Sequence, residues 1–149
     1  MNAPTRYGWH LWALALLALL LAACDESRLA ETAHVRQQLV GTWLSESNDS
    51  GLITRTLIEL TVDGELREFE KIIPGKGATR EAFYSGEWAL AGANFRRKYM
   101  TREGKPLPVN YFTTTTYAIN LIGDDRFFGV DNLQHRTIDF RRVAAGTRP

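Results

Sequence analysis

The sequence has very little cysteine and histidine. Cys24 is the single cysteine in 149 residues, so the chain cannot form an internal disulfide or a zinc site built on several thiolates. The three histidines have neither the His-x-His nor the His-x-x-x-His spacing of a zinc site. Binding of a metal by His135 with Asp131 is the weaker interpretation, because a turn aspartate and an exposed histidine account for both residues. We therefore predict no metal and no cofactor.

An excess of charge of one sign is also lacking. The chain has 18 Lys and Arg against 17 Asp and Glu, and the first 23 residues contain one of the basic residues, Arg6. A nucleic-acid binder owes much of its affinity to surplus basic residues that neutralise phosphates, so we predict no nucleic-acid partner. A Gly-x-Ser-x-Gly elbow, a phosphate loop and a dinucleotide fingerprint are missing from the sequence. We therefore predict that the protein is not an enzyme.

One long hydrophobic run is present, at the start of the chain. After Arg6, residues 9–23 are almost wholly apolar and end in small residues, which is the order found in a secretory signal. The run is shorter than the ~20 residues of a membrane-spanning helix, and acidic rather than basic residues follow it. We therefore predict a cleaved signal peptide over residues 1–23 rather than a permanent transmembrane helix.

The end of this signal, Leu21-Ala22-Ala23-Cys24, resembles the lipobox of bacterial lipoproteins. The resemblance implies transfer of a diacylglyceryl group to the Cys24 thiol, cleavage before this residue and, as a rule, acylation of the new amino group by a chain such as palmitate. Two or three acyl chains anchor a protein stably, so the membrane is the first predicted partner. An ordinary cleaved signal, with a cysteine at this position by chance, is the alternative.

Asp25 and Glu26 directly follow the predicted lipidation site. In enterobacterial lipoproteins an aspartate at this position resembles a retention signal for the inner membrane. We therefore expect a periplasm-facing protein of the bacterial cell envelope, on the inner rather than the outer membrane. The alternative is that these acidic residues simply favour the start of a helix.

The mature chain predicts a helix and then a series of strands. Residues 24–40 contain the lipidated cysteine and a polar segment with an apolar stripe, which predicts a short helical tether that packs on the domain or acts as a spacer. From Gly41 the pattern has a period of two, and Asp63-Gly64 is a strong hairpin signal. We predict a domain over 41–143 and a disordered tail over 144–149. The expected strands are 41–46, 52–62, 65–73, 79–90, 94–102, 111–122, 126–130 and 134–143.

Eight strands without an intervening helix favour an all-β, antiparallel up-and-down meander that closes into a small barrel. Gly41-Thr42-Trp43, Gly86-Glu87-Trp88 and the last strand around Arg142 resemble the small bacterial lipocalin-like domains. The resemblance implies that Trp43 lies at the closed end of the barrel and that an inward arginine stacks on its indole. Alternation selects Arg142 over Arg141, because Arg142 shares a face with Ile138 and Phe140. These residues would be structural rather than catalytic.

Two groups of charged residues could be mistaken for a catalytic or binding site. Glu68 and Glu70 share a strand face and could form a carboxylate pair of the glycosidase type, but we favour exposed carboxylates near Arg67 and Lys71. The cluster Arg96-Arg97-Lys98 could attract anionic headgroups. Alternation places Arg97 on the opposite face from its two neighbours, which favours a solvated strand surface instead.

We therefore predict a noncatalytic binding domain. Its ligand is a small apolar molecule or an envelope component, and the aromatic residues that serve the ligand or the core are Trp88, Phe95, Tyr99 and Tyr117. The alternative is a barrel filled with side chains whose loops, at 74–78 and 104–108, contact an envelope protein or inhibit an enzyme. The sizes of the inward side chains distinguish the two hypotheses.

Overall fold

The computed structural model describes residues 29–108, 111, 113–133 and 135–149. The predicted signal, Cys24, Asp25 and Glu26 lie outside these ranges. Residues 29–39 are helical, and in the described part of the chain no helix is long and apolar enough to span a bilayer. The strands in these ranges are β1 (Gly41–Asp49), β2 (Leu52–Leu60), β3 (Glu65–Ile73), β4 (Arg80–Ala91), β5 (Asn94–Arg102), β6 (Lys105–Pro106), β7 (Thr114–Ile122), β8 (Arg126–Asp131) and β9 (Thr137–Val143).

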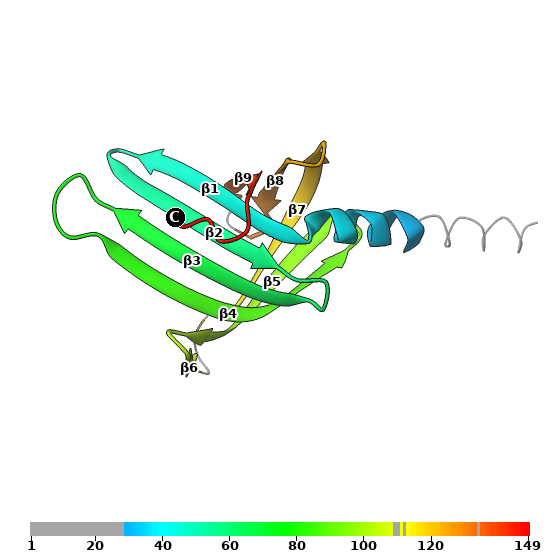
Figure 1. The fold of residues 1–149 in the computed structure, drawn as a ribbon, viewed down its shortest axis with the longest axis horizontal. Coiled ribbons are helices and arrows are strands. Elements are labelled where there is room, and N and C mark those ends of the chain that lie inside the picture. The colour runs from blue at the N-terminus through cyan, green and yellow to red at the C-terminus, as the bar shows by residue number, and fades with distance from the viewer. Residues whose placement is uncertain (1–28, 109–110, 112, 134) are drawn as a thin grey trace, which may run out of the picture.

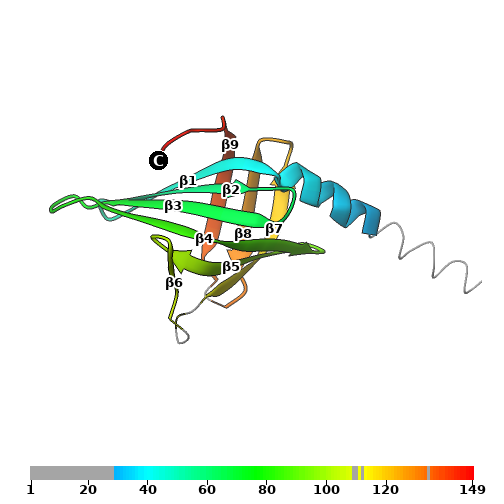
Figure 2. The same cartoon turned by 60° about the horizontal axis from the view of Figure 1, so that its bottom comes forward.

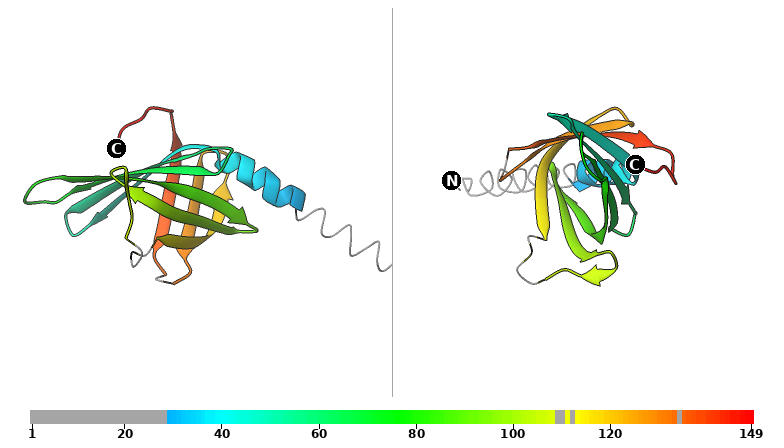
Figure 3. Two further views of the ribbon diagram at one scale, coloured as in Figure 1. Left: turned by 90° about the horizontal axis from the view of Figure 1, so that it is seen from below. Right: turned by 90° about the vertical axis from the view of Figure 1, so that its left-hand side faces the viewer.

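Eight of these strands form a closed antiparallel barrel. Their order is β4, β3, β2, β1, β9, β8, β7, β5, and β5 pairs back with β4. The two-residue strand β6 is hydrogen-bonded to β5 alone. Strands that are neighbours in the chain are also neighbours in the barrel, so the topology is a meander (Figures 1 and 3). The predicted fold, a lipocalin-like barrel of about eight strands preceded by a short helix, is confirmed.

The hairpin between β2 and β3 is where predicted, but its turn has another geometry. A type I′ turn at Asp63-Gly64 needs positive φ at both residues, and only Gly64 has it, at 89°. Gly64 N donates to Thr61 O over 3.1 Å, so Val62 and Asp63 are the central residues of the turn and Gly64 follows them. A turn of this kind with a glycine in the left-handed region also fits the twist of a hairpin.

Large aromatic side chains fill the half of the barrel that adjoins the helix. The Phe127 ring lies 4.9 Å from Trp43, 5.1 Å from Phe140 and 6.0 Å from Phe95, measured between ring centroids. All four side chains are buried, and Leu39 at the end of the helix packs on the same cluster. We call this half the closed end, since rings at these distances leave it filled with protein.

Arg142 joins the first strand, the last strand and the helix at the closed end. Its guanidinium lies 4.1 Å from the centroid of the Trp43 ring. It also donates to the carbonyl oxygens of Val40, over 2.9 Å, and of Gln38. Gly41 makes room for this arrangement, because a Cβ atom at this position would lie 2.4 Å from Nη1 of Arg142. Arg141 pairs with Leu44 on the opposite face and is exposed.

The other half of the barrel is open. β1 pairs with β2 over its whole length but with β9 only from Thr42 to Leu44, so the distal parts of β1 to β4 project as a sheet beyond the ring (Figures 1 and 2). Inward-facing residues here, such as Thr54, Thr56 and Tyr84, are partly exposed, whereas those at the closed end are buried. Solvent therefore enters the barrel from the end opposite the helix.

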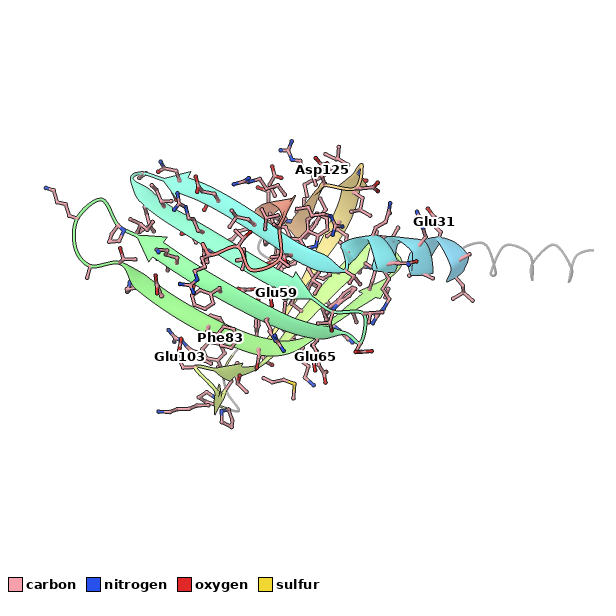
Figure 4. All side chains as sticks on the ribbon, viewed as in Figure 1. Glu31, Glu59, Glu65, Phe83, Glu103 and Asp125 are labelled. Carbon is pink, nitrogen blue, oxygen red and sulfur yellow. The ribbon has the colours of Figure 1, made fainter. Side chains whose placement is uncertain are left out.

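Closure between β4 and β5 depends on Gly86. The register shifts between Ser85 and Gly86, which marks a bulge. A Cβ atom at Gly86 would lie 1.9 Å from Lys98 O, so only glycine allows the two strands to approach this closely. Near the open end, Phe83 and Glu103 add two hydrogen bonds: Phe83 N donates to the Glu103 carboxylate over 2.7 Å, and Glu103 N donates to Phe83 O over 2.9 Å (Figure 4).

The segment 144–149 lies on the outer face of the sheet, where the sequence predicted a disordered tail. Thr147 N donates to Ala144 O over 3.2 Å, and Lys71 Nζ approaches Pro149 O to 3.4 Å. The underlying apolar row runs across four strands in direct register and consists of Leu44, Leu57, Phe69 and Phe83. We call it the outer apolar row.

Replacement of Arg142 by Met is expected to lower the free energy of unfolding by at least about 2 kcal/mol, because the carbonyl groups of Val40, Gln38 and Asp124 lose charge-assisted hydrogen bonds. Urea denaturation followed by tryptophan fluorescence measures this loss. Arg141→Met is the matched control and is expected to cost under about 0.5 kcal/mol, since Arg141 is exposed. Equal losses in the two variants would contradict the role assigned to Arg142.

Candidate functional site

A group of polar side chains lies inside the barrel, next to the closed end. Glu68 on β3 and Arg97 on β5 are buried, with exposed fractions of 8% and 5%. Both share a strand face with core residues, Leu66 for Glu68 and Phe95 for Arg97, so alternation directs them inward. Together with Tyr99 of β5 and Tyr117 of β7 they form what we call the buried polar cluster.

Hydrogen bonds connect every member of this cluster. Arg97 Nη1 donates to Glu68 Oε2 over 2.7 Å, and Tyr99 Oη donates to the same oxygen over 2.8 Å. Arg97 Nη2 donates to Tyr117 Oη over 2.9 Å. The guanidinium also lies 4.9 Å from the Tyr117 ring centroid and 5.8 Å from that of Tyr99. The charges of the ion pair balance each other, and the tyrosines hold its geometry.

The protonation of the cluster follows from its burial. Burial, the largest single influence, would lower the pKa of Arg97, but the Glu68 carboxylate together with Tyr99 and Tyr117 outweighs it and holds this pKa above its ordinary value. Burial also raises the pKa of Tyr99 well above its ordinary value, so this hydroxyl keeps its proton and acts as a donor. The cluster therefore contains a permanent cation and a neutral phenol at every physiological pH, which suits it to fixed hydrogen bonding rather than to proton transfer.

Two polar atoms next to this cluster are buried without a hydrogen bond to described protein atoms. They are Nε of Arg97 and Oγ1 of Thr115, two residues that are register partners on β5 and β7. A buried donor that lacks a partner costs about 1–3 kcal/mol. The cluster thus reduces the stability that an apolar filling would give, although its central ion pair is well bonded.

A second group lies further toward the open end, and we call it the open-end group. It contains Glu70 of β3, Tyr84 of β4 and Arg102 of β5. The Arg102 guanidinium is 5.6 Å from the Tyr84 ring centroid, and the Tyr84 ring is 5.6 Å from that of Tyr99. These three residues are partly or fully exposed. The open-end group therefore lies where solvent meets the interior of the barrel.

Burial changes the pKa values of this group as well. The pKa of Glu70 is raised by burial first and by the Glu68 carboxylate second, and Arg102 and Arg80 partly offset the change. Burial, and then the neighbouring Tyr111, raise the pKa of Tyr84 to about 12. The ionised form of Glu70 is therefore destabilised in the folded barrel. A hydrogen-bond donor from a bound molecule would reduce this destabilisation.

The sequence analysis placed some of these residues incorrectly. Glu68 is buried and paired, so the expectation of an exposed carboxylate near Arg67 and Lys71 is wrong for this residue. Arg97 is separated from Arg96 and Lys98 as alternation predicts, but it is a buried ion-pair partner and not part of a solvated surface. The spacing Phe95-x-Arg97-x-Tyr99 contained the signal, since it places a cation between two inward aromatic residues.

The other candidate residues lie in two separate places. Trp88 and Phe95 belong to the closed end, with 6.1 Å between their ring centroids, while Tyr99 and Tyr117 belong to the buried polar cluster. His135 and Asp131 are in a turn in which His135 N donates to Asp131 O over 3.0 Å. In the described ranges no three His, Cys, Asp or Glu side chains are grouped as metal ligands would be.

The comparison of this chain with known proteins rests on its fold. The closed eight-strand meander fits the lipocalin-like barrel that the sequence resembles. A comparison with models of protein families finds no match, and a comparison with curated proteins finds none either. Membership of a lipocalin-like family stays a prediction.

Removal of one partner of the buried ion pair is expected to be costly. Glu68→Leu or Arg97→Met should each lower the free energy of unfolding by about 3–5 kcal/mol, because the remaining charge is buried alone. The double variant should lose at least about 2 kcal/mol less than the sum of the two, as measured by urea denaturation. The exposed pair of Glu46 and Arg55, at 2.6 Å, is the control, with a coupling under about 1 kcal/mol. Equal coupling in the two pairs would contradict a special role for burial.

Replacement of Glu70 by Gln is expected to stabilise the protein at pH 7. A raised carboxyl pKa means that folding is favoured when the group is protonated, below its ordinary value of 4.5, and that this contribution is lost as the pH rises through the folded value. The thermal midpoint of Glu70→Gln should therefore exceed that of the parent protein at pH 7, and the difference should vanish at pH 4. Glu65→Gln, on the exposed start of β3 (Figure 4), should show no such pH-dependent gain.

Proposed function

We propose that this protein is a lipid-anchored lipoprotein of the bacterial envelope whose barrel binds a small ligand without catalysis. The observation that supports binding is the division of the barrel interior. Aromatic side chains fill the closed end, while the opposite half holds polar, partly exposed groups to which solvent has access. A small barrel whose interior is not filled by side chains is suited to hold one small molecule.

The proposed location rests on the sequence. The apolar run that ends in Leu21-Ala22-Ala23-Cys24 supports export, cleavage and acylation of Cys24. Asp25 supports retention at the inner membrane. The cluster chemistry supports a role without catalysis, because the Arg97 cation and the protonated Tyr99 hydroxyl are held in fixed hydrogen bonds.

A second candidate function, binding of a partner protein, is supported by one feature of the outer face. A groove of about 770 Å³ lies between the outer side chains of β2 to β4 and the segment 146–149. Its apolar lining comes from Leu57, Phe69 and Phe83 of the outer apolar row. An outward apolar row is unusual in a barrel that is solvated outside, and exposed apolar patches commonly mark contact sites.

One experiment tests the anchor and the ligand together. The full chain is expressed in a bacterium, extracted from membranes with mild detergent and weighed by native mass spectrometry. We expect acyl chains on a chain that begins at Cys24, and one noncovalent adduct of small-molecule mass. Cys24→Ser should lose the acyl mass, appear in the soluble fraction and retain the adduct. An unmodified chain would refute the anchor, and a bare acylated chain would refute the ligand.

A further inference from the structure

We propose that the ligand is an uncharged polar molecule rich in hydroxyl and amide groups, of the saccharide class, bound at the open-end group of Glu70, Tyr84 and Arg102. This inference rests on the proposed binding function and gives it a ligand class. It replaces the apolar ligand of the sequence-based prediction with a polar one. Three features of the structure lead to it.

The first feature is that the closed end is already filled. Trp43, Phe127 and Phe140 are at most 1% exposed, and their rings lie within 5.1 Å of a neighbouring ring in the cluster. Leu39 and the helix cover this end. An acyl chain would have to displace close-packed aromatic rings, and overpacking a core is destabilising. The apolar half of the barrel is therefore a core and not a ligand compartment.

The second feature is the chemistry of the open half. Glu70 offers two acceptor oxygens, Arg102 offers planar donors, and the Tyr84 ring lies between the strands that hold them. Hydroxyl and amide groups can donate to the Glu70 carboxylate and accept from the Arg102 guanidinium. A molecule with many hydrogen-bonding groups and no long apolar segment matches this lining better than a lipid does.

As part of this second feature, charges of both signs line the open half and suit a ligand that offers both donors and acceptors. Arg97 and Glu68 neutralise each other inside the buried polar cluster. Of the remaining inward groups, Glu70 is acidic and senses both Arg102 and Arg80. A ligand that presents only acceptors would leave Glu70 without a donor, and one that presents only donors would leave the two arginines without an acceptor. A neutral molecule with hydroxyl and amide groups offers both.

The third feature is the direction in which the barrel opens. The helix leaves the closed end and points away from the projecting hairpins of β1 to β4 (Figure 1). Cys24 precedes Leu29 by five residues, which span at most about 18 Å. An anchor at Cys24 therefore places the closed end toward the bilayer and the open end toward the aqueous side. Ligands reach this opening from water and not from the membrane.

The two tryptophans of the mature chain make the proposal testable by NMR. The indole N–H groups of Trp43 and Trp88 both report on the closed end, since they donate to Leu39 O over 2.8 Å and to Thr61 O over 3.0 Å. The Nε–H group of Arg102 reports on the open-end group. Residues 24–149 with Cys24→Ser include every described residue, and cooperative unfolding of this chain is checked first.

This ¹⁵N-labelled chain is titrated with a panel of neutral di- and trisaccharides of glucose and of N-acetylglucosamine, and separately with laurate. We expect at least one saccharide to shift the Arg102 Nε–H signal and the amides of β3 and β4 saturably, while both indole signals stay unchanged. Glu70→Ala should weaken that saccharide at least tenfold. Glu65→Ala, on the exposed face of β3, is the matched control and should leave affinity unchanged.

The other possible results separate the ligand class, the site and the binding function. Saturable binding of laurate with shifts of both indole signals, and no saccharide binding, would overturn the polar ligand class but uphold a binding function. Saccharide binding that Glu70→Ala leaves intact would overturn the assigned site. A folded chain that binds neither probe class up to roughly 10 mM, the range of very weak binding, would overturn the inference. If the native mass spectrum also shows no adduct, the binding function fails with it.

Discussion

The stacking of Arg142 on Trp43 is the interaction on which the closed end of the barrel depends. β1 and β9 are the first and last strands of the barrel and pair over only three residues, so few backbone hydrogen bonds hold them together. Arg142 adds a 4.1 Å cation–π contact and bonds to the carbonyl oxygens of Val40 and Gln38. One side chain thus links strand closure to the end of the helix.

That closure has a consequence for the rest of the interior. Because the helix and the Trp43 cluster seal one end, apolar burial is concentrated there, and the other end is free to contain polar groups. The buried polar cluster lies at the boundary between these two environments. A buried ion pair is rarely more stabilising than apolar side chains of similar volume. We therefore explain the pair of Glu68 and Arg97 by the neighbouring groups that it orients. The Glu68 carboxylate, fixed by Arg97 and Tyr99, adds to the larger effect of burial in raising the pKa of Glu70.

Most of the fold could be predicted from the sequence, because alternation and turn residues are local signals. The period of two places Arg142 inside and Arg141 outside, and the recurring turns predict the meander. The type of the turn before Glu65 could not be predicted, because Asp63-Gly64 fits more than one hairpin geometry. The short strand β6 and the packing of residues 144–149 depend on contacts with distant strands, which no local pattern encodes.

The candidate site was harder to predict than the fold. Alternation alone assigns Glu68 and Glu70 to one face, but it does not say that this face is the interior at that height of the barrel. The pairing of Glu68 with Arg97 joins residues 29 positions apart on β3 and β5, which β4 separates, and the pairing of β4 with β5 includes the bulge at Gly86. The open-end group likewise forms only once β3, β4 and β5 lie side by side. The sequence pattern of a single strand therefore cannot identify Glu70, Tyr84 and Arg102 as one group.

The junction between the helix and the barrel also determines how a force on the helix reaches the strands. The carbonyl oxygen of Leu39 accepts the Trp43 indole N–H, and Arg142 occupies the two carbonyl groups on either side of it. Tension applied to the helix is therefore passed to side chains in the first and the last strand at once. These hydrogen bonds would have to break together before β1 or β9 could separate from the barrel. We therefore expect β1, β9 and the end of the helix to resist such a force as one unit.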